Sequence, residues 1–415
     1  MAHHLVIQLA RFGDLLQTKR LLLSLAAEPN STVHLAVDTS LVPLARLIYP
    51  FAEVHGLRAH GSGTHMADVF RENRDVFAIL ASTPFNSIYN LNFTGMSLAM
   101  AGLFDPDIVR GYSRRNGQIL RSTWLRMAYR WMTDRRSAPM NLVDLWGHFH
   151  PDPIPAAAVN PKAMIGKIGR ILVVPAGREA RRSLPAEVLA PLVDVVFAAR
   201  GGPEIVLAGS AAERPFARKL TRLLRPIVAG NVTDTCGTTS LSDLVEIVEG
   251  SDLVLTPDTG IMHLAAHLGV AVKAFFLSSA WCFETGPYGE GHTIFQVTRT
   301  CAPCVESAQC PFDTTCLVPF SETAVRRLLL DKAPGPWPDN LAYLESRNDA
   351  FGCDYAVVHG SVPESSSRES LRALLAEYAA APLGRAIPAW AAENIFHESD
   401  WMLPRPDSLG VVRGE

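Results

Sequence analysis

The stretch DLVLTPDTGIMHLAAHLGVAVKAFF, residues 252–276, decides the fold of the domain around it. Residues 252–256 are typical of a buried β-strand, and the apolar residues that follow recur at the spacing of one helix face. Gly269 favours the end of that helix, and residues 270–276 are again typical of a buried strand. The stretch predicts a strand, a tight turn, a short helix and a second strand, which together make the parallel βαβ unit of α/β proteins.

The same alternation of strands and helices extends in both directions from this unit. It predicts an α/β fold with two doubly wound domains, residues 1–150 and 169–333. The segment between them, 151–168, contains four prolines and a run of alanines, which is typical of a connection. Residues 334–415 form an extension in which one helix, 368–381, is predicted and no role is evident. The predicted strands before the connection are 5–9, 32–37, 87–91 and 108–111; after it we predict strands at 171–174 and 204–208 and helices at 185–199, 211–224 and 240–249.

Composition excludes several classes of protein. The 415 residues exceed what one hydrophobic core usually supports, and the formal charge of −3 argues against nucleic acid as the main partner. The N-terminus lacks the cationic start of a signal peptide. The longest segment without charged residues, 76–104, contains a proline and three asparagines that would be costly in lipid, so we predict no membrane-spanning helix. A cytoplasmic protein is expected.

The turn at 257–260 has two interpretations. The free amides and positive dipole end of the following helix could hold a phosphate, with glycine at 260 permitting close approach and His263 donating to the same anion. Ordinary capping by Asp258 or Thr259, with Gly269 as the stop, explains the same residues without any ligand. The spacing alone leaves both interpretations open.

A set of motifs in order along the chain resembles glycosyltransferase family 9, the bacterial ADP-heptose lipopolysaccharide heptosyltransferases. The family's Asp-Thr-Gly-x-x-His motif stands here as Asp258-Thr259-Gly260-Ile261-Met262-His263, and the further matching segments are Gly13-Asp14, 265–269, 286–289 and 301–316. Together they cover roughly residues 1–330. The sequence departs from the family pattern at Pro257, at Lys19 where a proline is common, and at Leu184 where a tryptophan is usual.

The resemblance implies a GT-B fold, in which two Rossmann-like domains face a cleft and a C-terminal appendage follows. The acceptor would bind to residues 1–150 and the nucleotide sugar to residues 169–333. Asp14 would be the catalytic base of an inverting transfer, whereas a purely structural interpretation makes it a cap of the next helix.

The donor diphosphate would be held without a divalent metal or other cofactor. The resemblance assigns this binding to Arg182, Thr259, Gly260 and His263, while Asp258 would orient the turn or the donor sugar. The neighbouring Arg181 remains an alternative to Arg182.

Residues 108–136 carry eight arginines against one aspartate. Leu120, Trp124, Ala128 and Trp131 recur at helical spacing, so the segment predicts either a core helix with solvated arginines or a basic helix on anionic lipid. Arg114 and Arg115 are candidate contacts for a glycolipid or acidic glycan acceptor, and peripheral attachment to the inner membrane is compatible with this patch.

Four of the seven cysteines lie close together, at Cys301, Cys304, Cys310 and Cys316. Their spacing fits no standard metal motif, so a structural loop is our first interpretation, and structural zinc or an iron–sulfur cluster is the second.

The sequence as a whole predicts an inverting glycosyltransferase that moves a sugar, heptose in our first interpretation, from an ADP-sugar to a lipopolysaccharide core or related surface glycan. A non-catalytic nucleotide- or glycan-binding protein and a transferase that uses another nucleotide sugar are the alternatives.

Overall fold

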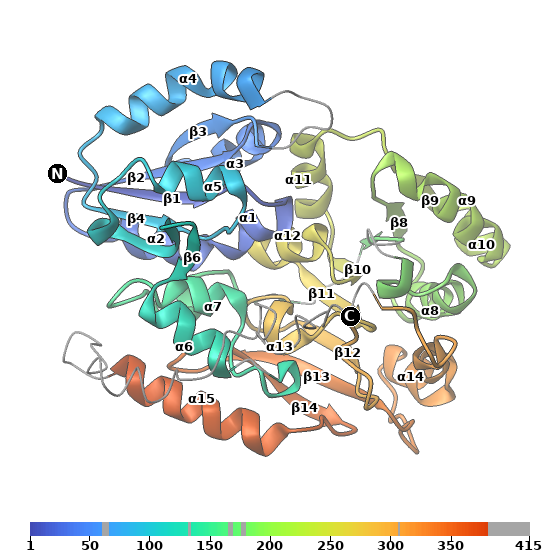
Figure 1. The fold of residues 1–415 in the computed structure, drawn as a ribbon. Helices are drawn as coiled ribbons and strands as arrows, with labels where there is room; N and C mark the ends of the chain where they lie inside the picture. Colours follow the sequence, from blue (N-terminus) through green and yellow to red (C-terminus); the bar gives the residue numbers. More distant parts are fainter. Residues whose placement is uncertain (60–65, 132–133, 165–168, 176–179, 306–307, 381–415) are drawn as a thin grey trace, which may run out of the picture.

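The computed structural model describes residues 1–59, 66–131, 134–164, 169–175, 180–305 and 308–380. They form two α/β domains, each built on one sheet, which lie side by side (Figure 1). The predicted pair of doubly wound domains is thereby confirmed.

The first sheet has the strand order β3-β2-β1-β4-β5-β6, in which β1 to β5 are parallel and β6 is antiparallel. One face packs on α4 and α5 through Leu5, Ile7, Leu80 and Met100. The other face carries α1 to α3. The strands are β1 (Ala2–Gln8), β2 (Ser31–Asp38), β3 (Glu53–Leu57), β4 (Ser87–Asn90), β5 (Val109–Arg115) and β6 (Gln118–Arg121). The helices are α1 (Phe12–Gln17), α2 (Lys19–Ala26), α3 (Val42–Ile48), α4 (Met66–Ser82), α5 (Gly95–Ala101), α6 (Thr123–Trp131) and α7 (Leu142–Gly147).

The second sheet has the order β14-β13-β12-β11-β10-β7-β8-β9, with β7 to β12 parallel. Its strands are β7 (Arg170–Val173), β8 (Glu204–Leu207), β9 (Val232–Asp234), β10 (Leu253–Pro257), β11 (Ala271–Phe276), β12 (Thr293–Val297), β13 (Leu341–Asn348) and β14 (Cys353–His359). Its helices are α8 (Ala186–Ala199), α9 (Arg214–Leu223), α10 (Pro226–Ala229), α11 (Leu241–Glu249), α12 (Gly260–Leu268), α13 (Cys282–Thr285), α14 (Thr323–Leu329) and α15 (Ser365–Ala380).

Local signals set several of these helix starts. Ser240 caps α11 by accepting from the Asp243 amide, and Asp243 accepts from the Ser240 amide in return. Pro185 is the N-cap of α8, as its missing N–H allows. The helix predicted at 211–224 is instead a 3₁₀ turn, Ala211–Glu213, followed by α9.

The basic segment differs from the prediction. Its residues up to 121 form the β5–β6 hairpin, so Leu120 lies on a strand and the helix begins only at Thr123. The spacing of Leu120 from Trp124 therefore does not belong to one helix.

The C-terminal extension contains two strands that the sequence analysis missed. β13 pairs antiparallel with β12, and β14 pairs with β13. α15 follows and runs along the bottom of the view in Figure 1. Its Arg372 donates to the Pro139 carbonyl at 2.9 Å, which connects the extension to the first domain. The described part of the extension thus completes the second sheet and contacts the first domain.

A buried polar network also joins the two domains. Asp144 accepts from Arg20 Nη1 at 2.6 Å, from the Tyr288 hydroxyl at 2.6 Å and from the Cys353 amide at 2.9 Å. Arg20 additionally donates to the Phe351 carbonyl. Helices α2 and α7 of the first domain are therefore held to residues that follow β11 and β13 in the second.

No helix among the described residues is long and apolar enough to cross a lipid bilayer.

Candidate functional site

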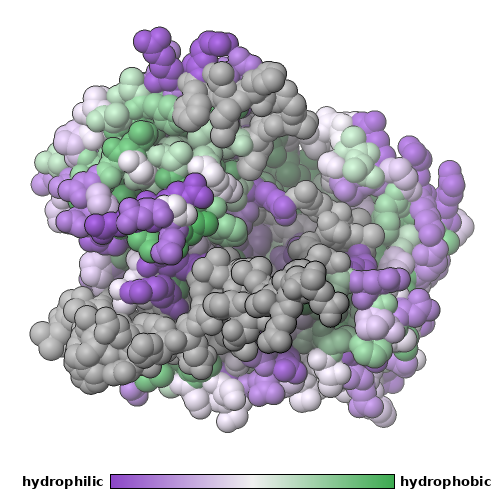
Figure 2. Space-filling model, in the orientation of Figure 1, coloured by the Kyte–Doolittle hydropathy of each residue, from purple (hydrophilic) through white to green (hydrophobic). Residues whose placement is uncertain are grey.

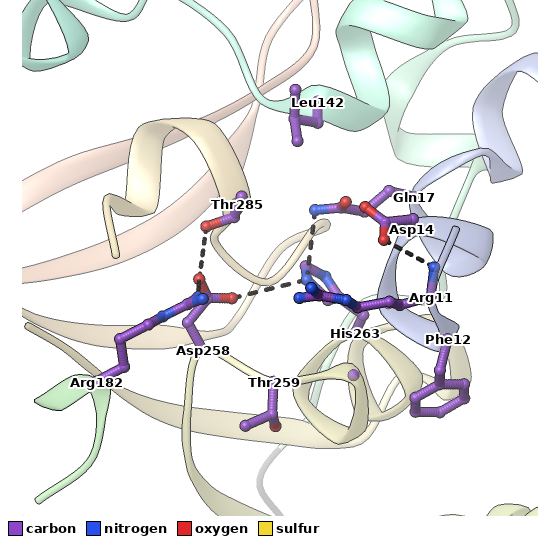
Figure 3. A pocket seen from close by; sticks show the side chains of 12 residues that line it. Arg11, Phe12, Asp14, Gln17, Leu142, Arg182, Asp258, Thr259, His263 and Thr285 are labelled. Carbon is purple, nitrogen blue, oxygen red and sulfur yellow. Dashed lines mark hydrogen bonds and ion pairs between the residues drawn. The ribbon is translucent and has the colours of Figure 1, made fainter. Parts of the chain in front are cut away.

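A pocket of about 330 Å³ lies between α1 and α12, where the two domains meet (Figure 3). It opens at the carboxyl ends of β1 and β10, the edge at which parallel sheets place ligand-binding loops. The residues that line it are Arg11, Phe12, Gly13, Asp14, Gln17, Leu142, Arg182, Asp258, Thr259, Gly260, His263 and Thr285. All six residues that the sequence analysis assigned to catalysis or donor binding are among them.

Thr259 starts α12. Its hydroxyl accepts from the Met262 amide at 3.4 Å and lies 3.0 Å from the Thr256 hydroxyl. Of the two predicted caps, Thr259 is therefore the one observed. The first amides of α12 adjoin the pocket, and amides at a helix start are donors that suit an anion.

Gly260 and Gly13 allow α1 and α12 to approach each other closely. A Cβ on Gly260 would collide with the Phe12 ring, and a Cβ on Gly13 would lie 3.2 Å from His263 Cδ2. The sequence predicted that another group comes close to the backbone at Gly260. In the structure this group is the Phe12 ring of the first domain.

The side chain of Asp258 is only 6% exposed and binds two side chains at the pocket. It forms an ion pair with Arg182 and accepts from the Thr285 hydroxyl at 3.0 Å. Arg182 lies at the pocket whereas Arg181 is not among its lining residues, so the geometry favours Arg182. The carboxylate of Asp258 positions the guanidinium beside the start of α12.

His263 is buried one turn into α12. Its Nε2 lies 3.3 Å from Gln17 Nε2 and 3.9 Å from Asp258 Oδ1. Burial lowers the pKa of His263 below 6.5, and the carboxylates of Asp258 and Asp14 oppose this only in part. The imidazole is therefore neutral at pH 7.

Asp14 occupies the third position of α1 and accepts from the Arg11 amide at 3.0 Å. The capping interpretation of this residue is confirmed. The same carboxylate lines the pocket, on the side formed by the first domain (Figure 3). Capping and a role in the pocket are therefore compatible, because a carboxylate has several lone pairs.

Three polar residues of the pocket were not predicted as part of it: Arg11, Gln17 and Thr285. The Arg11 guanidinium points into the middle of the pocket (Figure 3). Its position three residues before Asp14, in the loop after the first strand, was the available sequence signal. Gln17 and Thr285 gave no signal, since each reaches the pocket only through tertiary packing.

Arg114 and Arg115 lie elsewhere. Both are exposed on the β5–β6 hairpin and neither lines the pocket. Hydrophilic and hydrophobic side chains are interspersed over the face of the first domain seen in Figure 2. A role of these arginines in acceptor binding remains a prediction.

The four clustered cysteines are all free thiols. Cys310 Sγ accepts from the Thr314 amide at 3.4 Å, and burial raises the pKa of Cys304 and of Cys316. Within the described residues, no three of the four sulfur atoms fall within 4.8 Å of one another.

Comparison with known proteins extends these observations. Residues 162–315 match the model of glycosyltransferase family 9 (heptosyltransferase). No curated protein sequence matches the chain significantly.

The solved structures that share the fold at low sequence identity include the following three. ADP-heptose lipopolysaccharide heptosyltransferase II of E. coli has a TM-score of 0.54 at 16% identity, over 80% of this chain and 99% of its own. A family 9 glycosyl transferase of Veillonella parvula has a TM-score of 0.53 at 16% identity, over 71% and 85%. E. coli heptosyltransferase WaaC, solved with ADP, has a TM-score of 0.53 at 15% identity, over 70% and 92%. The expected arrangement of two Rossmann-like domains in a GT-B fold is confirmed.

Proposed function

We propose that this chain transfers heptose from ADP-heptose to a lipopolysaccharide core or related surface glycan, with inversion at the anomeric carbon. The match of residues 162–315 to the model of glycosyltransferase family 9 supports this proposal. One observation carries the proposal. The Asp14 carboxylate of the first domain lines the same pocket as Arg182 and the start of α12, which belong to the second domain.

The second domain supplies the donor site. The amides at the start of α12 and the Arg182 guanidinium would bind the diphosphate, while Asp258 holds Arg182 in place. Thr259, Gly260 and His263 shape this side. Charge that develops on the leaving diphosphate would be stabilised by Arg182 and Arg11, so the proposed reaction needs no divalent metal.

The first domain supplies the base. Asp14 would accept the proton of the acceptor hydroxyl as its oxygen bonds to the anomeric carbon. The bond from that carbon to the diphosphate oxygen breaks with its electron pair, and ADP leaves. An acidic glycan or glycolipid acceptor would suit Arg114 and Arg115, and we place the reaction in the cytoplasm, at the inner face of the inner membrane.

The first test is thermal unfolding with ADP, UDP, GDP and NAD in turn. A ligand at a hundred times its dissociation constant stabilises the folded protein by about 2.7 kcal/mol. We expect a selective upward shift with ADP that EDTA does not change. A preference for UDP or GDP would transfer the proposal to another donor, and no shift with any nucleotide would contradict it.

The second test isolates the base by substituting Asp14→Asn. We expect transfer from ADP-heptose to fall by at least about 100-fold, because the proton acceptor is lost, while ADP binding is kept. Asp243→Asn is the matched control, since Asp243 occupies the same capping position in α11, away from the pocket. Both variants should lose a similar helix-capping contribution of about 1 kcal/mol. Near-normal turnover in Asp14→Asn would refute the assignment.

A further inference from the structure

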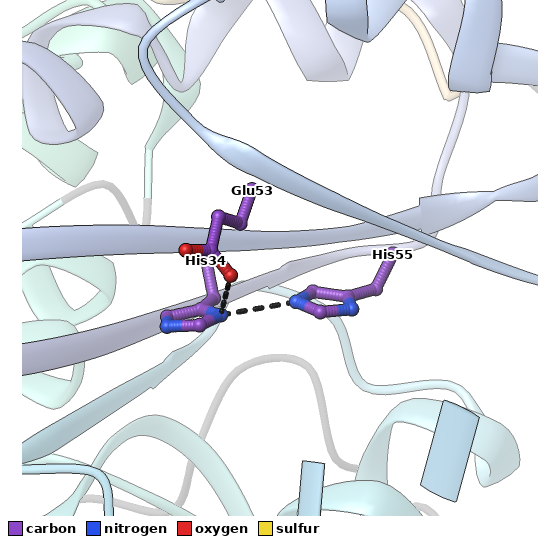
Figure 4. A group of neighbouring side chains, drawn as sticks. All are labelled: His34, Glu53 and His55. Carbon is purple, nitrogen blue, oxygen red and sulfur yellow. Dashed lines mark hydrogen bonds and ion pairs between the residues drawn. The ribbon is translucent and has the colours of Figure 1, made fainter. Parts of the chain in front are cut away.

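Four polar side chains gather on one face of the first sheet, at the end away from the pocket. His34 on β2 pairs in register with Glu53 on the edge strand β3, and His55 stands two residues further along β3. Residues two apart on a strand share a face, so all three side chains project to the same side (Figure 4). His3 on β1 adjoins them, with its Nδ1 3.0 Å from His34 Nε2.

The three donor atoms are spaced like the ligands of one metal ion. His34 Nδ1 lies 3.0 Å from His55 Nε2 and 3.4 Å from Glu53 Oε2, and all three atoms fall within 4.8 Å of one another. In a tetrahedral zinc site with bonds of about 2.0–2.1 Å, neighbouring ligand atoms are roughly 3.3 Å apart. Two of the three spacings already match this value within a few tenths of an ångström.

We propose that His34, His55 and Glu53 form a binding site for a divalent transition metal, with zinc the best fit. Two imidazoles and one carboxylate are a donor set that zinc takes readily, whereas calcium and magnesium prefer all-oxygen sites. Water would complete the coordination.

The surroundings fit such a site in two respects. His3 provides a partner for His34: with Nδ1 of His34 on the metal, its Nε2–H donates to His3 Nδ1, the contact that orients a metal-bound imidazole. Glu53 provides access, because its side chain is 61% exposed while that of His34 is 5% exposed. A metal could therefore enter from solvent beside β3 and bind to a prepared histidine.

The site would link the edge strand β3 to β2. His3 lies near the start of β1 and Glu53 is the first residue of β3, whereas the pocket lies beyond the carboxyl end of β1. The metal would thus stabilise the first sheet without taking part in sugar transfer. This inference does not rest on the proposed function.

The competing explanation is a chain of hydrogen-bonded neutral imidazoles. His3 can donate to His34, which can donate to His55 or Glu53, and no metal is then needed. The two explanations differ in whether the free protein binds metal here.

The experiment is a titration of chelator-treated full-length protein, without a histidine tag, with Co²⁺ followed by absorption and with Zn²⁺ followed by calorimetry. Cobalt bound by nitrogen and oxygen lacks the thiolate charge-transfer absorption that cobalt at the clustered cysteines would show. We expect one equivalent with the nitrogen and oxygen signature. Glu53→Gln, His55→Ala and His3→Ala should each weaken the affinity for the metal by about 10-fold or more. Glu249→Gln, which changes an exposed carboxylate elsewhere on the protein, should leave the affinity unchanged.

Thermal unfolding in EDTA keeps the test interpretable. Glu53→Gln should unfold near the wild-type temperature in EDTA, so lost metal binding cannot be attributed to misfolding. Zinc should raise the unfolding temperature of wild type and not that of Glu53→Gln. Two results would overturn the proposal: absence of the nitrogen and oxygen signature in wild type, or equal affinity in wild type, Glu53→Gln and His55→Ala.

Discussion

His263 illustrates how burial sets the chemistry of a single residue. The lone pair of the Gln17 amide nitrogen is delocalised into its carbonyl group, so this nitrogen only donates. In the contact between them His263 Nε2 therefore accepts, which places the imidazole proton on Nδ1. A histidine in this state does not donate to a phosphate through Nε2. The predicted hydrogen bond from His263 to the phosphate therefore requires that ligand binding adds a proton to the imidazole or changes its tautomer.

We expect ADP binding to take up protons in the pH range around 6.5, the ordinary pKa of histidine. Burial holds the pKa of His263 below 6.5 in the free protein, and a nearby diphosphate favours the charged imidazole, so binding raises this pKa. ADP affinity should accordingly increase as the pH falls through this range. Calorimetry in buffers of different ionisation enthalpy measures the uptake directly. His263→Gln should lack it, and an equal uptake in that variant would assign the proton to another group.

Arg11 lines the pocket, but its role was not predicted from the sequence. Since its guanidinium points into the pocket, Arg11→Ala should weaken ADP binding or transfer by about 10- to 100-fold, the value of one charge-assisted hydrogen bond. Arg74→Ala, an exposed arginine on α4, is the control for net charge. Unchanged dissociation constants and turnover for Arg11→Ala would exclude Arg11 from the site.

At the level of elements, the contact between α1 and α12 positions the pocket. α12 follows β10 and α1 follows β1, so the loops of the two sheets meet where these helices begin (Figure 1). Phe12 packs over Gly260, and Gly13 packs beside His263. Asp14 and the start of α12 are thus brought together by two glycines, one in each domain.

Gly260→Ala should destabilise the protein by about 1–3 kcal/mol, because its methyl group would collide with the Phe12 ring. Phe12→Ala removes that ring, so the same change made in a Phe12→Ala background should be less harmful. The double-mutant cycle, measured by denaturant unfolding, should give a coupling of about 0.5–3 kcal/mol. Strictly additive effects would show that the collision is relieved in another way.

For the whole molecule, Lys19 links both domains. Its ammonium donates to Asn160 Oδ1 at 2.8 Å and to the His267 carbonyl at 3.3 Å, and burial lowers its pKa to about 8. The folded protein thus releases this proton at lower pH than the unfolded chain, whose lysine has a pKa of 10.5. The contribution of Lys19 to the free energy of unfolding therefore increases as the pH rises from about 8 to 10.5. When the pH falls again, this gain disappears and is fully lost once the pH is below about 8.

The stability of wild type relative to Lys19→Met should increase over that range by up to about 3 kcal/mol. Denaturant unfolding at a series of pH values gives the free energy of unfolding of each protein. In the difference between wild type and Lys19→Met, the contributions of the other groups that titrate in this range cancel. Lys219→Met is the control: this lysine is exposed and pairs with Glu187, so the rise that burial causes at Lys19 should be absent. A flat difference for Lys19→Met as well would show that Lys19 keeps its ordinary pKa in the folded protein.

The sequence by itself determined the two α/β domains, the βαβ unit at 252–276 and the turn that begins α12. These features depend on periodicity and capping, which act over a few residues and can be recognised one segment at a time. The same local signals missed β13 and β14, because antiparallel strands added to the edge of a sheet are stabilised by distant partners rather than by their own composition.

Only the tertiary structure decided which polar groups meet. Asp14 and Asp258 were identified through the resemblance to family 9, and their position in one pocket follows from the packing of α1 on α12. Arg11, Gln17 and Thr285 joined that pocket, and His34 came to lie beside His55, because side chains far apart in the sequence were brought within a few ångströms of each other. Such proximity depends on how the sheets and helices pack, which no local pattern encodes.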